Sequence, residues 1–356
     1  MNETSKKTID ACRFCWMCRH ICPIGNATGL ERNTARARAL GLSLVNRGVY
    51  DLSEVAENLY ECACCGACTK ECATGFDPVA FVKDARLDAA LSGKLPPYIL
   101  KAVRNCLETG NAYGVTETDP ALKEAIARHA EKKNVLLFLG VDARCRVPES
   151  AVNAIKVLEK AGVDFTVLAD EPASGWQLAY LIGHAAETEN VMKNCASVLA
   201  GYDTVIAYDP QDASVFCREY AEWGITGKKA VTFTSYLAKL VSDGKLTGEK
   251  KVKAVYHDPF QLSRDLGETE EPRKVISRFA DLSEMLCFGK HTMWAGNLLM
   301  AEWMPDVMRR VAADRLTNVK GVKADTVVTA SVSEYASLKA VATDVRVISI
   351  EELILM

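Results

Sequence analysis

Two cysteine runs with identical spacing constrain this chain more than any other feature of its sequence. The first run, within residues 11–25, contains Cys12, Cys15, Cys18 and Cys22 and is followed by a proline. The second run, within residues 60–75, contains Cys62, Cys65, Cys68 and Cys72. Because the same spacing occurs twice, the two runs indicate one shared chemical role.

The remaining sequence indicates a reducing compartment. Residues 1–12 are polar and lack the apolar core of a signal peptide. No apolar run approaches the length of a membrane span, so we expect a cytoplasmic protein with no membrane span. The net charge of −3 and the absence of a lysine- or arginine-rich block predict no nucleic-acid partner.

Clustered cysteines in a reducing compartment more often bind metal than form disulfides. Nine of the 14 cysteines lie between residues 12 and 72. The others are scattered, and we interpret them as small buried hydrophobic residues: Cys106, Cys145, Cys195, Cys217 and Cys287.

Iron–sulfur clusters account for the spacing better than zinc does. Two residues between cysteines allow one tight loop to present successive sulfurs to neighbouring corners of an iron–sulfur cube. Structural zinc, the alternative, usually takes two C-x2-C pairs brought together across a loop. Zinc would leave a triplet followed by a fourth cysteine unexplained.

The runs resemble the C-x2-C-x2-C-x3-C-P run of bacterial two-cluster ferredoxins, whose fourth cysteine binds the other cluster. The resemblance implies that one [4Fe–4S] cluster is bound by Cys12, Cys15, Cys18 and Cys72. It implies that the second is bound by Cys22, Cys62, Cys65 and Cys68. The second run departs from the pattern because Ala73 replaces the proline, and the extra Cys64 is expected to be a spectator.

The segment between the runs places the clusters in a helical frame. Apolar positions recur at helical spacing within residues 27–61, and Asp51 or Ser53 is a candidate cap. Arg13, Arg19 and Lys70 are candidate counter-charges for the clusters, or simply solvated cations. The arrangement resembles the iron–sulfur subunits of succinate dehydrogenase, glycolate oxidase and heterodisulfide reductase.

The second half alternates short apolar runs with helices, which is typical of α/β units. Strands are predicted at residues 134–140, 163–170, 203–209, 230–234, 252–258, 325–330 and 345–350. The segment at 202 aligns with that at 324, and the segment at 231 with that at 345. A repeat of about 120 residues predicts two related lobes.

The sequence "VYHDPFQLSRDLGETEEPRKVI" resembles the cysteine-rich CCG domains of heterodisulfide reductases and related oxidising systems. The expected fold is therefore α+β and multidomain, with a helical two-cluster ferredoxin domain followed by two α/β lobes of the CCG type. We expect the ferredoxin domain at residues 1–115 and a helical linker at 116–133. The two lobes are expected at residues 134–250 and 251–356.

The lobes depart from the CCG pattern where that family binds a noncubane cluster. Ala173-Ser174-Gly175 and Cys287-Phe288-Gly289 replace the two Cys-Cys-Gly triplets, and Phe260 replaces the cysteine after His-Asp-Pro. The C-x-x-C positions are occupied by residues 209–212 and 331–334. Only Cys287 survives, and one thiolate cannot hold a multi-iron cluster.

Two interpretations of the second lobe remain open at this stage. His257, Asp258, Cys287 and His291 could form a zinc or iron site of mixed ligands. In the plainer interpretation, Asp258 shapes a strand-to-helix turn and the histidines form hydrogen bonds nearby.

These features predict an electron-transfer subunit that relays single electrons through two [4Fe–4S] clusters. The sequence contains no G-x-G-x-x-G or Walker A motif, so we expect the flavin on another chain. The resemblance implies a hetero-oligomer with an FAD-containing dehydrogenase or oxidase subunit and a further electron carrier. The alternative is a catalytic thiol/disulfide reductase that uses Cys287.

Overall fold

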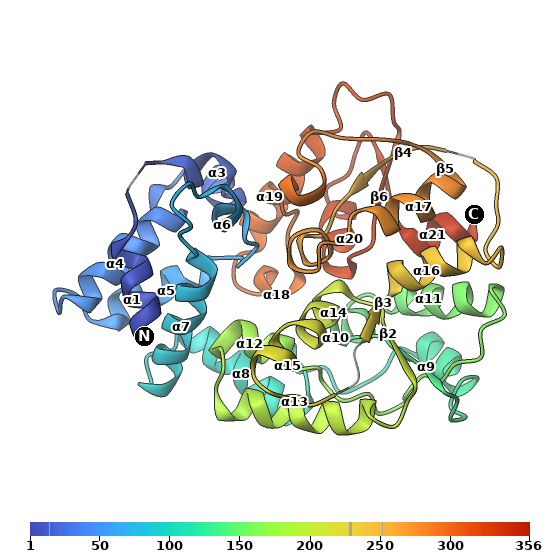
Figure 1. Ribbon diagram of the computed structural model, residues 1–356, viewed down its shortest axis with the longest axis horizontal. Helices are drawn as coiled ribbons and strands as arrows, with labels where there is room; N and C mark the ends of the chain where they lie inside the picture. The colour runs from blue at the N-terminus through green and yellow to red at the C-terminus, as the bar shows by residue number, and fades with distance from the viewer. Residues whose placement is uncertain (14, 228–229, 251) are drawn as a thin grey trace.

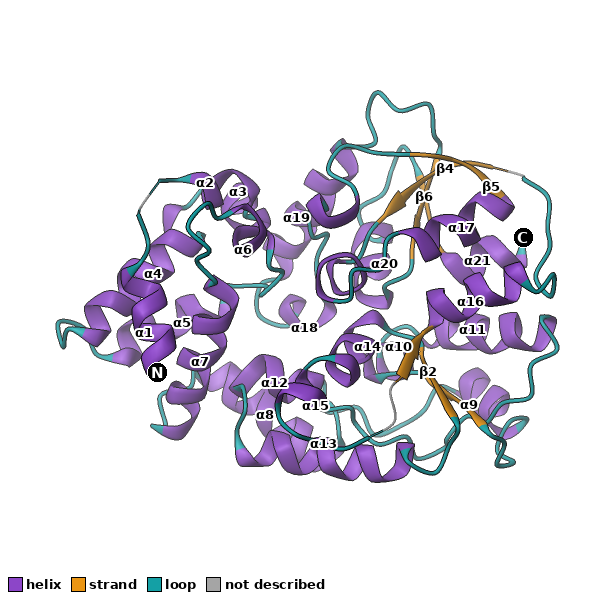
Figure 2. Ribbon diagram, viewed as in Figure 1, coloured by secondary structure: helices purple, strands orange, loops and turns teal. Residues whose placement is uncertain are grey.

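The computed structural model describes residues 1–13, 15–227, 230–250 and 252–356. Figure 1 shows a helical N-terminal region, drawn in blue to cyan, beside two lobes that contain strands. The first lobe is green to yellow and the second is orange to red. Figure 2 shows that the strands lie only within these two lobes. The α+β architecture with two α/β lobes is therefore confirmed.

Short helices build the N-terminal region. Their bounds are α1 (Glu3–Asp10), α2 (Met17–Ile21), α3 (Pro23–Thr28), η1 (Glu31–Asn33), α4 (Ala35–Asn46), α5 (Leu52–Tyr60), α6 (Ala67–Glu71), α7 (Pro78–Leu91) and α8 (Pro97–Thr109). The segment predicted as helical at 27–61 forms mainly α4 and α5, which a turn with Gly48 at φ 70° separates. Asp51 caps α5 in a reciprocal capping box with Glu54. Helix α9 (Pro120–Ala127) follows, within the expected linker.

The first lobe is a parallel sheet with strand order β1-β2-β3. Its strands are β1 (Val135–Phe138), β2 (Thr204–Ala207) and β3 (Ala230–Thr232). Its helices are α10 (Val141–Cys145), α11 (Pro148–Lys160), α12 (Trp176–Ile182), α13 (Ala186–Leu199), α14 (Pro210–Cys217), α15 (Glu219–Glu222) and α16 (Phe233–Ser242).

The second lobe is a parallel sheet with strand order β5-β4-β6-β7. Its strands are β4 (Val252–His257), β5 (Ala280–Ser283), β6 (Thr326–Thr329) and β7 (Arg346–Ser349). Its helical segments are η2 (Gln261–Asp265), α17 (Glu270–Phe279), η3 (Gly289–His291), α18 (Leu298–Ala301), α19 (Pro305–Thr317), α20 (Val332–Lys339) and α21 (Ile350–Leu355).

The two sheets show how the repeat is built. Strand β2 lies between β1 and β3, as β6 lies between β4 and β7, and a helix follows each of β2, β3, β6 and β7. The predicted strand at 163–170 is wrong, because only Thr166 forms a bridge, to Leu136. The next amide, that of Val167, bonds instead to the carbonyl of His129 at 2.9 Å. Strand β5, which the sequence interpretation missed, occupies the corresponding position beside β4.

One hydrophobic core runs through both lobes. It includes Leu137 and Ile206 of the first sheet and Val255 and Val327 of the second. Helix α11 packs against α21, and the buried Tyr208 hydroxyl donates to the Glu351 carboxylate. The lobes are therefore joined through buried contacts.

The N-terminal region packs against the first lobe along α7 and α12. The Tyr60 hydroxyl donates to the carbonyl of Leu181 at 2.8 Å, and Lys83 forms an ion pair with Glu219 at 2.8 Å. Gly183 lies directly at this contact. A Cβ placed there would lie 3.0 Å from the Lys83 carbonyl oxygen. This glycine lets the first lobe approach α7 closely.

We expect Gly183→Ala to destabilise the protein more than a matched substitution elsewhere. Gly183 has φ 62° and a crowded neighbourhood, whereas Gly162 has φ 64° and nothing within 4 Å of its Cβ position. Backbone strain should cost Gly162→Ala about 1 kcal/mol. Gly183→Ala should lower the free energy of unfolding by roughly 3 kcal/mol, because it adds a clash. Denaturant unfolding measures both, and equal losses would contradict the close packing described here.

Candidate metal centre

The two cysteine runs fold in the same way. Trp16 (φ 70°, ψ −4°) precedes α2 and Gly66 (φ 71°, ψ 1°) precedes α6, both in the left-handed region. Each short helix then ends at an extended cysteine, Cys22 (φ −76°, ψ 109°) or Cys72 (φ −74°, ψ 114°). This conformation costs Trp16 about 1–2 kcal/mol, whereas glycine adopts it readily. The repeated spacing thus encodes a repeated backbone loop.

The first predicted set of ligands lines one cavity. Helix α2 packs against α6, which brings the runs together. The cavity is bordered by Cys12, Cys15, Cys18 and Cys72, together with Cys68. Cys15 is exposed, and the adjacent Trp16 is 45% exposed. This set therefore lies at the surface of the molecule.

The second predicted set lies deeper. Burial raises the pKa of Cys22 and Cys68, and it raises the pKa of Cys65 to about 11. After burial, the neighbours that raise the pKa of Cys68 most are Cys62, Cys65 and Cys22, ahead of Cys18. Cys68 thus lies near Cys62, Cys65 and Cys22, and it also borders the cavity of the first set. The assignment of each thiolate to iron stays a prediction.

Cys64 differs from the eight spaced cysteines. It has φ 53°, and its amide lies 3.4 Å from the sulfur of Cys62. The Cys64 thiol, together with Arg38 and Arg86, holds the pKa of Cys62 well below its usual range. Cys64 thus contacts the predicted ligand Cys62, but it lines a cavity other than that of the first set. Its role as a spectator stays a prediction.

Three arginines surround the second set, and the sequence interpretation named none of them. Arg86 is fully buried, and its guanidinium donates to the carbonyls of Leu59 at 2.7 Å and Cys62 at 2.8 Å. Arg38 donates to the carbonyl of Glu61 at 2.7 Å. Arg264 donates to that of Cys65 at 2.8 Å.

Among the described residues, none of these three guanidiniums forms an ion pair with a carboxylate. A buried cation without a counter-charge is costly. Four thiolates bound to iron would supply the missing negative charge. The donor set and its surroundings therefore fit an anionic four-thiolate cluster at Cys22, Cys62, Cys65 and Cys68.

The cations that the sequence did suggest are placed differently. Arg19 forms an ion pair with Glu31 at 3.3 Å. Arg13 lines the cavity of the first set. Lys70 is exposed and lines a separate cleft between the second cysteine run and the two lobes. Only Arg13 and Arg19 are thus positioned near the first set.

In the first lobe, hydrogen bonds occupy the positions where the CCG pattern has cysteines. The Ser174 hydroxyl donates to the Asp212 carboxylate, and both side chains are buried. Burial raises the pKa of Asp209 and Asp212 well above the usual range. Burial and the neighbouring carboxyl groups thus disfavour the charged forms of both side chains.

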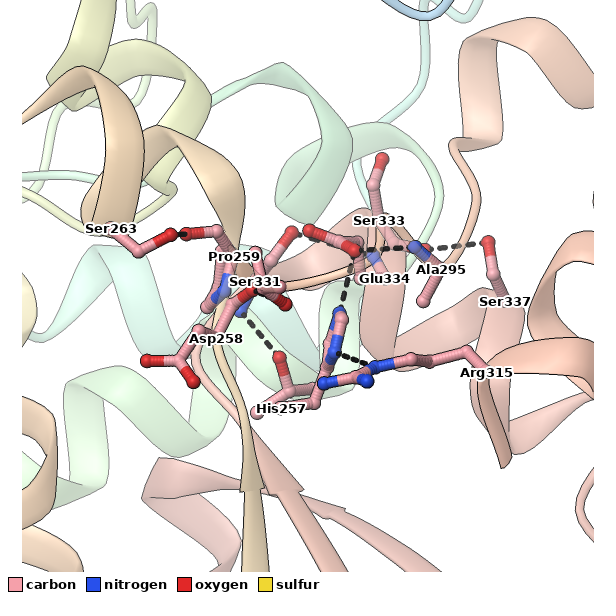
Figure 3. Close-up of polar contacts among 12 residues, drawn as sticks. His257, Asp258, Pro259, Ser263, Ala295, Arg315, Ser331, Ser333, Glu334 and Ser337 are labelled. Carbon is pink, nitrogen blue, oxygen red and sulfur yellow. Dashed lines mark hydrogen bonds and ion pairs between the residues drawn. The ribbon is translucent and has the colours of Figure 1, made fainter. Parts of the chain in front are cut away.

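In the second lobe, the candidate ligands of a mixed metal site have other partners. Figure 3 shows the buried His257 between Glu334, at 2.6 Å, and Arg315, at 3.0 Å. Asp258 binds Arg273 through both carboxylate oxygens, and His291 reaches Glu71 at 3.0 Å. His257, Asp258, Cys287 and His291 belong to no group of three or more described side chains that could hold a metal ion. The geometry agrees with the plainer interpretation of a hydrogen-bonded turn.

A cleft of about 530 Å³ opens where the second cysteine run meets both lobes. Cys64 and Gly66 line it from the run, and Arg264 lines it from η2. Trp176 and Trp294 of the two lobes also line it. Cys287 is not among its lining residues.

Comparisons with known proteins agree with the cysteine geometry. Residues 8–76 match the 4Fe-4S dicluster domain family. The chain is 28% identical over 77% of its length to a probable membrane-anchored ferredoxin of Chromohalobacter salexigens, of which it spans 42%. It is 22% identical over 91% of its length to a subunit of the fumarate reductase (CoM/CoB) of Methanothermobacter marburgensis, of which it spans 66%.

The chain is also 23% identical over 89% of its length to a subunit of the dihydromethanophenazine:CoB–CoM heterodisulfide reductase of Methanosarcina acetivorans, of which it spans 85%. The N-terminal region is thus a 4Fe–4S dicluster domain, and the protein holds two [4Fe–4S] clusters. Most of the chain is distantly homologous to heterodisulfide reductase subunits. No described helix is long and apolar enough to cross a membrane.

Anaerobically prepared protein should contain about eight irons and eight acid-labile sulfides. Cys22→Ser should lower the iron content because it removes a ligand of the deeper set. Cys64→Ser is the matched control and should leave the iron content intact. Iron and sulfide analysis with metal quantification checks this, and stoichiometric zinc or roughly four irons would contradict it.

Cys287→Ala should leave the iron content and the spectra unchanged, because the lobe positions around it carry no further thiolates. Electron paramagnetic resonance of the oxidised and reduced protein tests this directly. A signal of a third, noncubane cluster that disappears in this variant would show that the lobe still binds iron.

Proposed function

We propose that this chain, which carries a 4Fe–4S dicluster domain and is distantly homologous to heterodisulfide reductase subunits, is the electron-transfer subunit of a multi-subunit oxidoreductase. It would relay single electrons through its two clusters between a flavoprotein partner and another carrier. The observation that carries the proposal is that two cysteine runs packed against each other through α2 and α6 are joined to lobes in which hydrogen bonds occupy the ligand positions of the CCG pattern.

The chain's own residues would hold the clusters and orient them. Residues 12–22 and 62–72 supply the thiolates, and the loops before α2 and α6 set the direction of the sulfurs. The clusters supply one-electron steps when bound. Two-electron chemistry on an organic substrate needs a cofactor such as a flavin, which we assign to another polypeptide.

The lobes would act as a docking scaffold. In this proposal residues 1–115 form the cluster domain, 116–133 the linker, and 134–250 and 251–356 the lobes, with residue 251 outside the described ranges. Trp303 donates from the second lobe to the carbonyl of Tyr60 at 3.2 Å, and Tyr180 donates from the first lobe to that of Cys62 at 2.7 Å. Both lobes therefore hold the loop of the second run, which supports their role in positioning the clusters for a partner.

Partner and location belong to the same proposal. A hetero-oligomer with an FAD-containing dehydrogenase or oxidase subunit remains the favoured assembly. A cytoplasmic location is also proposed, although one relative is described as membrane-anchored. The alternative, a thiol reductase using Cys287, finds no support in the cleft, since Cys287 does not line it.

The purified chain alone should accept electrons from dithionite yet oxidise no hydroxy acid and reduce no disulfide. The reason is that its described residues offer thiolate ligands but no group suited to two-electron chemistry. Anaerobic assays that follow the cluster spectra and the product check this. Substrate turnover by the single chain without flavin would falsify the relay function.

Cys15→Ser in the assembled complex should stop electron flow through the clusters while the partner keeps its flavin, because Cys15 is a predicted cluster ligand. Flavin content and cluster reduction by substrate, measured on the same complex, check this. Cys145→Ser, a cysteine outside both runs, is the matched control and should leave electron flow unchanged.

A further inference from the structure

The two cluster sites differ most in the charge around them. At the deeper set, the guanidiniums of Arg38, Arg86 and Arg264 each donate to carbonyls of the second run or of the residue before it. Arg38 and Arg86 are 3% and 0% exposed. Further donors of both end on backbone carbonyls, such as those of Asn33 and Tyr180, whereas the Arg86 Nε has no partner among the described residues.

Two cations near the surface set share one carboxylate. Arg19 and Arg36 both form ion pairs with the single carboxylate of Glu31, at 3.3 Å and 2.9 Å. Arg19 and Glu31 are about half and one-third exposed, so water and salt weaken their fields. The face of Trp16 lies 3.9 Å from the Arg36 guanidinium and is itself exposed.

Backbone amides form hydrogen bonds to cysteine sulfurs at both sites, so these bonds do not distinguish one site from the other. Amides of residues 74–76 reach the sulfur of Cys72 in the surface set. Amides of Gly25 and Ala67 reach those of Cys22 and Cys65 in the deeper set. The two sites therefore differ in burial and in the charge around them, and both are determinants of cluster potential.

Reduction adds one negative charge to a cluster that is already anionic. Positive charge in a low-dielectric surrounding stabilises that added charge more than screened surface charge does. We propose that the cluster at Cys22, Cys62, Cys65 and Cys68 has the higher reduction potential and receives electrons from the cluster at Cys12, Cys15, Cys18 and Cys72. This rests on the proposed relay function and gives it a direction within the chain.

In this account the reduction potential of the deeper cluster is set by three positioning residues, Arg38, Arg86 and Arg264. Arg264 is the most informative of them, because it reaches the second run from η2 of the second lobe and also donates to the carbonyl of Thr292 at 2.7 Å. One electron leaves the surface cluster as it is oxidised and reduces the deeper cluster by one. No further reactant is required for that step.

A redox titration of the loaded protein, followed by electron paramagnetic resonance, tests the order. Arg264→Gln should lower the higher of the two reduction potentials. At a fixed applied potential, the ratio of reduced to oxidised deeper cluster should fall at least tenfold, which corresponds to 59 mV for one electron. Arg264→Lys keeps the charge and should recover most of that shift. Arg19→Gln, the control at the surface set, should leave the higher potential unchanged.

A measurement on the unaltered protein keeps the proposal testable if a variant loses its clusters. A soluble dysprosium chelate should speed the relaxation of the signal from the exposed cluster, which we expect to be the one with the lower potential. Stronger relaxation of the higher-potential signal, or a downward shift of the lower potential in Arg264→Gln, would overturn the order. Iron and sulfide content, measured on the same samples, separates this outcome from failure of the relay function itself.

Discussion

The structure depends on three guanidiniums, two buried and one partly exposed, that donate to the backbone of the second cysteine run and of the residue before it. Arg38 comes from α4, Arg86 from α7 and Arg264 from the second lobe, so one loop gathers contacts from three parts of the chain. Arg86 also donates to the carbonyl of Tyr180 in the first lobe. Because Arg38 and Arg86 lack carboxylate partners among the described residues, a cluster bound at the deeper set would supply the negative charge that favours their burial. Cofactor binding and the packing of the lobes are thereby coupled.

The same reasoning explains why the lobes keep their fold without metal ligands. In the first lobe Ser174 and Asp212 satisfy each other, and in the second lobe Glu334 accepts from the Ala295 amide and bonds to His257 (Figure 3). Hydrogen bonds thus pair one oxygen of Asp212 and one of Glu334, whereas the other oxygen of each, and one of Asp209, has no partner among the described residues.

Much of the fold was predictable from sequence, because spacing and periodicity are local properties. The two cysteine runs and the repeated strand-and-helix segments at 202 and 324 predicted the cluster region and the paired lobes. The arginine contacts were not predictable, since each joins residues far apart in the chain, as Arg264 and Cys65 show. The strand expected at 163–170 failed for a similar reason, because His129 takes the amide of Val167 away from the sheet.

Electron exchange between a flavoprotein and this chain's clusters is the central step of the proposed function. The most direct measurement is anaerobic purification of the assembly from cells that make it, followed by spectra of flavin and clusters during reduction. We expect that a flavin-bearing subunit co-purifies and that its reduction is followed by reduction of the clusters, or that reduced clusters in turn reduce the flavin. An assembly without a flavoprotein, or clusters that never exchange electrons with the flavin, would contradict it.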